Sequence, residues 1–192
     1  MEKLRLGLAL TGSYCCYDKA IAAAEALGKK YDITFLMSET AASTDSRFGK
    51  AEDFIARLEE ISGRRVMRSI VEAEAVGPGK MFDVLVIAPC TGNTAAKLTH
   101  GITDSCVTMA AKSHLRNGGP VLLAIGTNDG LSGSAKNIGE LLNRRNIYFV
   151  PFYQDDPAAK PRSLASDYDS LERSILAAAR GEQLQPILYS GD

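Results

Sequence analysis

The sequence lacks an excess of charge of either sign and lacks long hydrophobic runs. Its 192 residues carry 22 Lys and Arg against 23 Asp and Glu, a net charge of −1. A nucleic-acid-binding domain normally presents a basic face, so this balance argues against that class. No apolar run approaches the roughly 20 residues that span a bilayer, and none is followed by a signal-peptide cleavage site. We therefore expect a cytoplasmic protein with no nucleic-acid or membrane partner.

Cysteines are few, and their spacing matches no known pairing pattern. The four positions are Cys15, Cys16, Cys90 and Cys106. They form neither a C-x-x-C pair nor a zinc-binding spacing. Free thiols are the default in a reducing compartment. We expect four free thiols and no metal site.

Histidine is scarcer still. His100 and His114 both lie near the ends of predicted helices, where a dipole interaction or solvent exposure is the expected role. The sequence shows no Ser/His/Asp order and no H-E-x-x-H motif, so the common hydrolase and zinc-protease arrangements are absent. The acidic pair at 155–156 is interpreted as part of a solvated face.

What the chain does contain is a regular alternation of apolar runs and helical patterns. Its 45% hydrophobic and 23% charged residues are typical of one ordinary globular domain. Alternating strands and helices predict a parallel sheet with right-handed crossovers, and therefore an α/β fold. The strands are expected at residues 4–10, 33–37, 83–88, 121–125 and 147–150.

We predict a single domain over residues 1–192, with its core at about 4–150 and a C-terminal helix and tail in 151–192. The strand at 147–150 is expected to be the last. The tail from Gln183 is expected to pack on a neighbouring molecule. One face of an amphipathic helix is marked by Leu164, Tyr168, Leu171 and Ile175. Residues 39–49 are predicted to form a long polar loop, and residues 66–70 a short strand.

Small polar residues follow several of the predicted strands. The clearest case lies within residues 84–104, where an apolar run ends and Thr91, Asn93 and Thr94 precede a helix. Ligands of such folds bind at the carboxyl ends of strands. A helix N-terminus there offers free N–H groups and a positive dipole end, which suit a phosphate. Three hydrogen-bonding side chains exceed what one helix cap needs, so we predict an anion site.

Similar loops follow the other predicted strands. Gly12 permits a close backbone approach, Ser13 places a hydroxyl at a helix start, and Ser38 and Thr127 end two further strands. The first loop is neither a Walker A loop nor a G-x-G-x-x-G fingerprint. A purely structural role is the alternative in each case. Ser13 would then only cap its helix, and residues 127–129 would form a capping segment.

These residues resemble the flavoprotein family, which includes the flavin-containing cysteine decarboxylases and the prenyl-flavin synthases. The resemblance covers roughly residues 4–150, and its specific part is the A-P-C-T-G-N-T element at 88–94. The remaining features that it rests on are Thr11-Gly12-Ser13, Lys97, Gly101-Ile102 and Asp104. A more detailed similarity, nearly end to end, is to the family of dipicolinate synthase B subunits. It is carried by residues 43–49, 115–118, 124–129, 146–152 and 154–161.

The resemblance implies a three-layer, flavodoxin-like or Rossmann-like domain with an FMN site. It also implies oxidation of dihydrodipicolinate to dipicolinic acid during endospore formation, in the mother cell of a spore-forming bacterium. The expected partners are a dipicolinate synthase A subunit that carries NADP and a small dicarboxylate substrate. A homo-oligomer is expected, because relatives place the flavin between subunits.

The resemblance also assigns roles to individual side chains. Cofactor binding falls to Gly12, Ser13, Ser38, Thr91, Asn93, Thr94, Thr127 and Asn128. A dicarboxylate substrate calls for a cationic clamp. Arg47, Lys97 and Arg162 are the candidates, although each is equally explained as a solvated surface charge.

Two departures from the family pattern bear on the chemistry. The cysteine decarboxylases use a histidine before the central strand, whereas this chain has none before His100, so their reaction should be absent. The family's A-P-x-M-N element is replaced by Ile-Gly-Thr-Asn at residues 125–128. These departures favour a second hypothesis. It describes a non-catalytic partner whose vestigial flavin or phosphate pocket supports an A subunit that binds NAD(P).

Overall fold

Seven strands form one sheet in the described part of the chain, residues 3–189 of a computed structural model. They are β1 (Arg5–Leu10), β2 (Asp32–Met37), β3 (Val84–Cys90), β4 (Val121–Thr127), β5 (Ile147–Phe149), β6 (Phe152–Tyr153) and β7 (Leu164–Ser166). The parallel strands follow the order β2-β1-β3-β4-β5. This is the flavodoxin-like order, in which the chain switches direction between β1 and β3. The predicted α/β class with a parallel sheet is confirmed.

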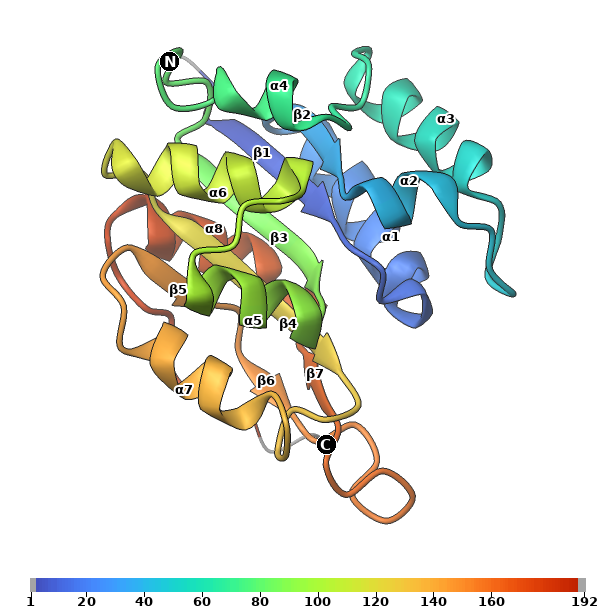
Figure 1. Ribbon diagram of the computed structural model, residues 1–192, viewed down its shortest axis with the longest axis vertical. Helices are drawn as coiled ribbons and strands as arrows, with labels where there is room; N and C mark the ends of the chain where they lie inside the picture. Colours follow the sequence, from blue (N-terminus) through green and yellow to red (C-terminus); the bar gives the residue numbers. More distant parts are fainter. Residues whose placement is uncertain (1–2, 190–192) are drawn as a thin grey trace.

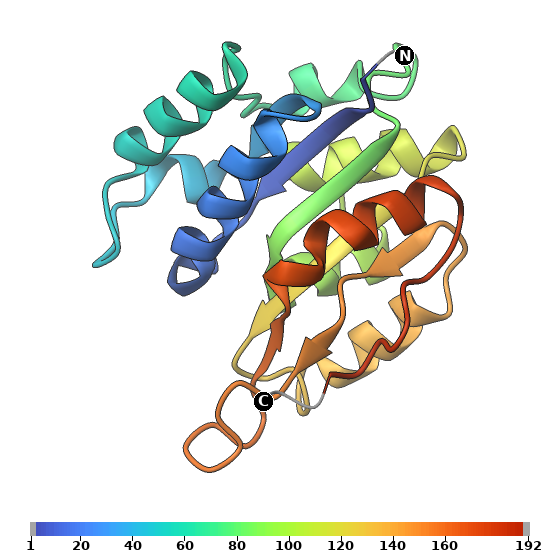
Figure 2. The same ribbon diagram turned by 180° about the vertical axis from the view of Figure 1, so that it is seen from behind.

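Helices cover both faces of the sheet and complete three layers (Figures 1 and 2). They are α1 (Tyr17–Gly28), α2 (Glu39–Ser43), α3 (Ala51–Ser62), α4 (Ile70–Glu74), α5 (Gly92–His100), α6 (Cys106–Arg116), α7 (Ala135–Leu142) and α8 (Leu171–Ala179). One face packs against α1, α3 and α8, the other against α4 to α7. All of β3 is buried, as expected for an apolar run covered on both sides. No helix within residues 3–189 is long and apolar enough to cross a membrane.

The chain beyond residue 150 returns to the sheet, so the prediction that the strand at 147–150 is the last is wrong. β7 pairs antiparallel with the end of β4, where Thr127 lies opposite Leu164. The helix expected from Leu164 begins only at Leu171, since Leu164 belongs to β7 and Tyr168 to a short 3-10 helix. Strands of two and three residues are too short to show an alternation, which explains the error.

The tail from Gln183 to Tyr189 packs on its own chain, while its expected packing on a neighbouring molecule stays a prediction. The Gln183 side chain accepts a hydrogen bond from the Phe149 N–H at 2.8 Å and donates one to the Phe149 carbonyl at 2.7 Å. The Phe152 N–H donates to the Ile187 carbonyl at 3.0 Å. The tail therefore covers the last parallel strand and β6.

Two local predictions also fail. Residues 39–49 are not loop throughout, because Ser38 caps the short helix α2. At 66–70 only Met67 forms a bridge to β2, and a capping box at Ser69 then starts α4. Short helices held by their caps carry too little apolar periodicity to be recognised in a sequence.

For His114 a dipole interaction at a helix end or solvent exposure was expected; the structure places it in the last turn of α6 but buries it. Its side chain is 4% exposed, and its ring lies so close to Gly119 that a Cβ there would fall 2.3 Å from it. Burial lowers the pKa of His114. His100 is exposed at the end of α5, as predicted. The four cysteines are free thiols, also as predicted.

Candidate functional site

Two adjoining cavities lie at the carboxyl ends of β1, β3 and β4. The first, here called the β4 cavity, has a volume of about 330 Å³ and is bounded by the loops after β1, β3 and β4 and by the segment 155–165. The second, the α2 cavity, has about 320 Å³ and lies between α2 and the start of α6. Gly12, Thr91 and Asn93 line both. The cavities therefore meet at the β1/β3 switch point, where ligands of this fold class bind.

Thr11 joins the ends of β1 and β3. Its hydroxyl donates to the Pro89 carbonyl at 2.8 Å and accepts from the Thr91 N–H at 3.1 Å. Thr11 was not among the site residues predicted from the sequence. Because its side-chain hydroxyl bonds two backbone groups at the end of β3, Thr11 fixes the relative position of the loops after β1 and β3, which line the cavities.

Ser13 does not cap its helix, so the structural alternative for this residue is wrong. The 3-10 helix that follows it, Tyr14–Cys16, shows no side-chain cap bond from Ser13. The hydroxyl instead lies 3.8 Å from the Cys15 Sγ and 3.6 Å from the Cys16 Sγ. Sulfur is a weak hydrogen-bond partner, so this hydroxyl keeps its capacity for a stronger one in the β4 cavity.

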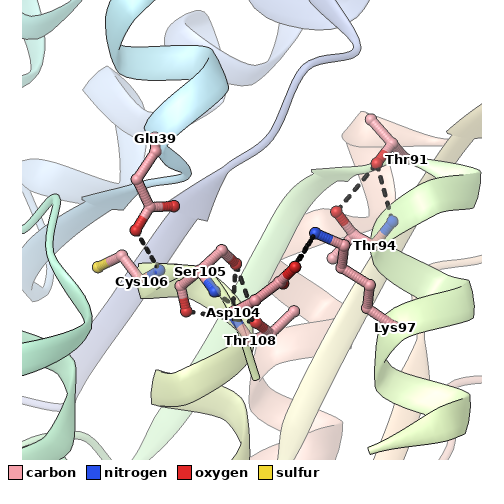
Figure 3. Close-up of polar contacts among 8 residues, drawn as sticks. All are labelled: Glu39, Thr91, Thr94, Lys97, Asp104, Ser105, Cys106 and Thr108. Carbon is pink, nitrogen blue, oxygen red and sulfur yellow. Dashed lines mark hydrogen bonds and ion pairs between the residues drawn. The ribbon is translucent and has the colours of Figure 1, made fainter. Parts of the chain in front are cut away.

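Of the three polar residues predicted after β3, Thr91 and Thr94 stabilise the start of α5, and Asn93 is free to bind a ligand. Thr91 caps α5 by accepting from the Thr94 N–H at 3.1 Å, and the two hydroxyls lie 2.9 Å apart (Figure 3). Asn93 is exposed, and its side chain has no hydrogen-bond partner among residues 3–189. Thr94 is buried. Of the three side chains predicted here, Asn93 is therefore the one that faces the cavities without a partner.

The loop after β4 is organised by Asp129. Its carboxylate accepts from the Thr127 hydroxyl at 2.6 Å and from the Ser134 hydroxyl at 2.8 Å, and these bonds lower the pKa of Asp129. Asn128 is exposed, and no hydrogen bond joins its side chain to another described residue. A Cβ on Gly92 would fall 2.3 Å from the Ser134 Oγ. Only glycine therefore lets the start of α5 approach this loop so closely.

The side chains of Ser38 and Glu39, at the α2 cavity, each accept a hydrogen bond from a backbone N–H at the start of a helix. The Ser38 hydroxyl accepts from the Ala41 N–H at 3.3 Å. The Glu39 carboxylate accepts from the Cys106 N–H at 3.0 Å and so covers the N-terminus of α6 (Figure 3). The prediction for Ser38 places it correctly at the cavity, whereas no pattern in the sequence indicated the carboxylate beside it.

The structure brings one of the three predicted cations to a cavity. Lys97 lines the α2 cavity and pairs with Asp104 at 2.8 Å (Figure 3). Arg47 lies outside both cavities, with its guanidinium 4.8 Å from the centre of the Phe48 ring. Arg162 is exposed and also lines neither. The clamp therefore does not form from these three side chains within the described chain.

A second ion pair was missed. Lys160 and Asp155 line the β4 cavity and lie 3.1 Å apart. Burial opposes ionisation of Asp155, but hydrogen bonds to Ser163 and Lys160 outweigh it, and its pKa is lowered. Asp155 is exposed, in agreement with the solvated face expected at 155–156, but it also carries an ion pair that the sequence did not indicate. The signal in the sequence was the pair of prolines, Pro157 and Pro161, which favour turns, and both residues lie in turns in the structure.

Comparison with known proteins agrees with this geometry. The chain matches the Flavoprotein family over residues 1–161. The B subunit of dipicolinate synthase from Bacillus subtilis (strain 168) is 41% identical over 192 residues, covering 98% of this chain and 96% of the relative.

Solved structures give the same picture. The crystal structure of the dipicolinate synthase B subunit from Bacillus halodurans C has a TM-score of 0.90 and 39% identity, and the match covers 100% of both chains. Burkholderia xenovorans DmrB in complex with FMN, described as a cubic protein cage for redox transfer, has a TM-score of 0.66 and 20% identity. That match covers 89% of this chain and 92% of DmrB and shows the shared fold alone. The chain belongs to the Flavoprotein family and to the family of dipicolinate synthase B subunits.

Proposed function

We propose that this chain is the B subunit of a dipicolinate synthase, that it binds FMN across the two cavities, and that it contributes to the oxidation of dihydrodipicolinate. The observation that carries the proposal is a set of cavity-lining polar side chains that have no strong hydrogen bond within the described chain. Asn93 and Asn128 have no hydrogen bond to a described residue, and Ser13 has only sulfur neighbours. These side chains line the cavities and keep their donors and acceptors free for a ligand, and a few convergent polar groups in a cavity are typical of a ligand site.

The residues present fit an FMN group. Each cavity has a volume in the range of small-molecule sites, and together they form an elongated space. A Cβ on Gly126 would lie 3.1 Å from the Cys16 Sγ and 3.2 Å from the Ser13 Oγ, so the bare backbone there keeps the β4 cavity open. FMN binds at the β1/β3 switch point of flavodoxin, and this chain has its cavities at the same topological position.

We assign the phosphate to Gly12, Ser13, Ser38 and the Thr91–Thr94 segment, and the flavin ring to Thr127 and Asn128. A bound flavin supplies a two-electron acceptor, through which a dihydropyridine ring becomes aromatic. The protein's part is binding and orientation. The Thr11 bonds fix the loops, and Asn93 offers donors and an acceptor at their junction.

The dicarboxylate is expected to interact with Lys97 and Lys160. Each lysine is already paired with an aspartate, so a substrate carboxylate must share the lysine or displace its partner. Arg47 and Arg162 remain candidates only in an assembly with further chains. We include in the proposal a homo-oligomer and an A subunit that carries NADP.

The second candidate function is a non-catalytic subunit with a vestigial pocket. The observation that favours it is the acidic lining. Asp104, Asp129 and Asp155 all line the cavities and all have lowered pKa values, so they are charged at neutral pH. Three carboxylates beside two paired lysines oppose the binding of a phosphate or a dicarboxylate.

FMN titration followed by absorbance and fluorescence separates the two candidates. We expect the purified protein to take up one FMN per chain at micromolar concentration, and Asn93→Ala to weaken uptake about tenfold, equivalent to about 1.4 kcal/mol. Asn143→Ala is the matched control, because Asn143 is exposed at the end of α7 and lines neither cavity. If the unmodified protein takes up no FMN yet still supports synthase activity with the A subunit, the vestigial pocket is the correct candidate.

A further inference from the structure

A further pocket lies beside the α2 cavity, where the end of α5 meets the middle of α6, two helices that are neighbours in Figure 1. It has a volume of about 230 Å³, and we call it the α6 pocket. Lys97 lines both this pocket and the α2 cavity. The two spaces therefore adjoin at one lysine side chain, although the flavin proposal uses no other residue of the α6 pocket.

The lining of the α6 pocket is cationic. Lys97, Lys112 and Arg144 contribute to it, and none of the described residues that line it is Asp or Glu. The two cavities of the candidate site differ in this respect, because carboxylates line each of them. The whole chain has a net charge of −1, so the pocket is a local concentration of positive charge on a nearly neutral protein. Such a lining attracts an anion.

Lys112 is the cation that is free to bind a ligand. It is exposed on α6, and no hydrogen bond or ion pair joins its side chain to another described residue. Lys97 is paired with Asp104 at 2.8 Å (Figure 3). An anion between the two lysines therefore gains Lys112 without displacing a partner and competes with one carboxylate for Lys97.

Arg144 favours an anion in a different way. Its guanidinium donates to the carbonyls of Leu98 and Thr99 in the last turn of α5 and pairs with Glu140. The carbonyl end of a helix is partially negative and repels an anion. Because Arg144 covers these carbonyls, that repulsion is reduced beside the pocket.

Apolar side chains form the rest of the wall. Leu98 is buried and Leu115 is half-buried, whereas Ile102 is 45% exposed. A ligand with an apolar body that covers Ile102 removes this surface from water, which is favourable. The pocket is smaller than the roughly 300–1,000 Å³ of sites for drug-sized ligands, so it suits a single ring.

We propose that the α6 pocket binds a small monocarboxylate with an apolar ring, whose carboxylate lies between Lys97 and Lys112 and whose ring lies on Ile102. One consequence rests on the proposed function, in which the substrate dicarboxylate also contacts Lys97. A ligand in the α6 pocket then weakens dicarboxylate binding in the α2 cavity, and the dicarboxylate weakens binding in the pocket by the same factor.

The test is a titration of the full chain with benzoate at low ionic strength, followed by ligand-observed NMR, with benzamide as the uncharged probe of similar shape. We expect benzoate to bind in the millimolar range. Benzamide should bind at least about threefold more weakly, and Lys97→Gln and Lys112→Gln should each weaken benzoate binding about threefold, as for a partly exposed ion pair.

Matched controls locate the ligand. Arg116→Gln should leave benzoate binding unchanged, because Arg116 is an exposed cation in the last turn of α6 that does not line the pocket. Ile102→Ser should weaken benzoate binding, whereas Leu131→Ser should not, since Leu131 is also about half exposed but lies outside the pocket.

Three results would overturn the proposal: no benzoate binding at about 10 mM, equal affinities for benzoate and benzamide, or an unchanged affinity in Lys112→Gln. Dipicolinate titrations with and without excess benzoate test the consequence, and benzoate should weaken dipicolinate binding less in Lys112→Gln than in the unmodified protein. An equal effect in both would place benzoate in the α2 cavity itself and overturn the proposal. If benzoate binds and dipicolinate does not, the proposed function fails at its substrate, while the α6 pocket stands on the benzoate titrations.

Discussion

Gly92→Ala is expected to separate the start of α5 from the loop after β4 and so to enlarge the junction of the two cavities. The new Cβ would lie 2.3 Å from the Ser134 Oγ, 2.9 Å from the Thr127 Oγ1 and 3.0 Å from an Asp129 carboxylate oxygen. Real Cβ atoms essentially never approach other heavy atoms to within 3.0 Å, so the loop or the helix must move.

The magnitude follows from two opposing effects. Overpacking costs about 1–3 kcal/mol, while replacing a helical glycine by alanine returns about 0.5–1 kcal/mol. The midpoints of these two ranges give a net loss of about 1 kcal/mol in the free energy of unfolding. Because the moved loop carries Thr127 and Asn128, FMN uptake should weaken about tenfold, which corresponds to about 1.4 kcal/mol.

Urea unfolding and FMN titration measure the two effects on the same protein. Gly139→Ala is the matched control, because no heavy atom lies within 4 Å of its added Cβ, and it should gain about 0.5–1 kcal/mol. In the double variant Gly92→Ala, Ser134→Ala the loss of stability should be smaller than the sum of the losses in the two single variants, because the atom nearest to the new Cβ is removed. If Gly92→Ala unfolds at the same urea concentration as the unmodified protein, the close approach does not constrain this junction.

Three further predictions concern protonation and charge. The pKa of His114 is lowered by burial, so the unfolded chain binds a proton at about pH 6.5 that the folded chain does not. The free energy of unfolding should therefore fall as the pH drops below about 6.5. Urea unfolding at several pH values measures this dependence. The dependence of the unfolding free energy on pH should become weaker in His114→Gln and stay the same in His100→Gln. Asp155→Asn removes the charged partner of Lys160 and should tighten the binding of dipicolinate several-fold, as measured by calorimetry. The neighbouring variant Asp156→Asn is the control and should bind dipicolinate as the unmodified protein does. Equal affinities of the two variants would show that the ion pair does not weaken dipicolinate binding. Burial raises the pKa of Cys16 to about 11 and those of Cys90 and Cys106 to about 12, so only Cys15 should react rapidly with a thiol reagent at pH 8. Rapid reaction of two or more thiols without unfolding would contradict this.

The sequence was sufficient to predict the parallel sheet because its five strands are long apolar runs separated by amphipathic helices. It placed most of the candidate residues at the cavities for the same reason, since strand ends in this fold share one edge. It could not predict β7. This strand pairs with the end of β4, where Leu164 lies opposite Thr127, a residue 37 positions earlier in the chain.

Pairings between side chains were equally beyond the sequence. Lys97 was predicted as a substrate-binding cation and Lys160 was not. Neither could be matched to its aspartate partner, because the loops decide which aspartate lies beside each lysine. The burial of His114 depends on its contact with Gly119, which lies beyond the end of α6. Such contacts depend on where turns place the chain, and a turn's direction is not encoded in hydrophobic periodicity.

One wall of the β4 cavity is formed by the connection between β6 and β7, whereas the other walls are loops that follow the parallel strands. Residues 154–163 connect β6 to β7 and are held beside the parallel sheet by the short antiparallel pairing of β7 with β4 and by hydrogen bonds of Arg162 and Ser163 to the end of β4 and the loop after it. Changing the length of such a connection costs little, about 0.6 kcal/mol for each doubling. This segment therefore behaves as an exchangeable module. Its length and sequence are expected to be changeable at a small cost in stability, and the lining of the cavity would change with them.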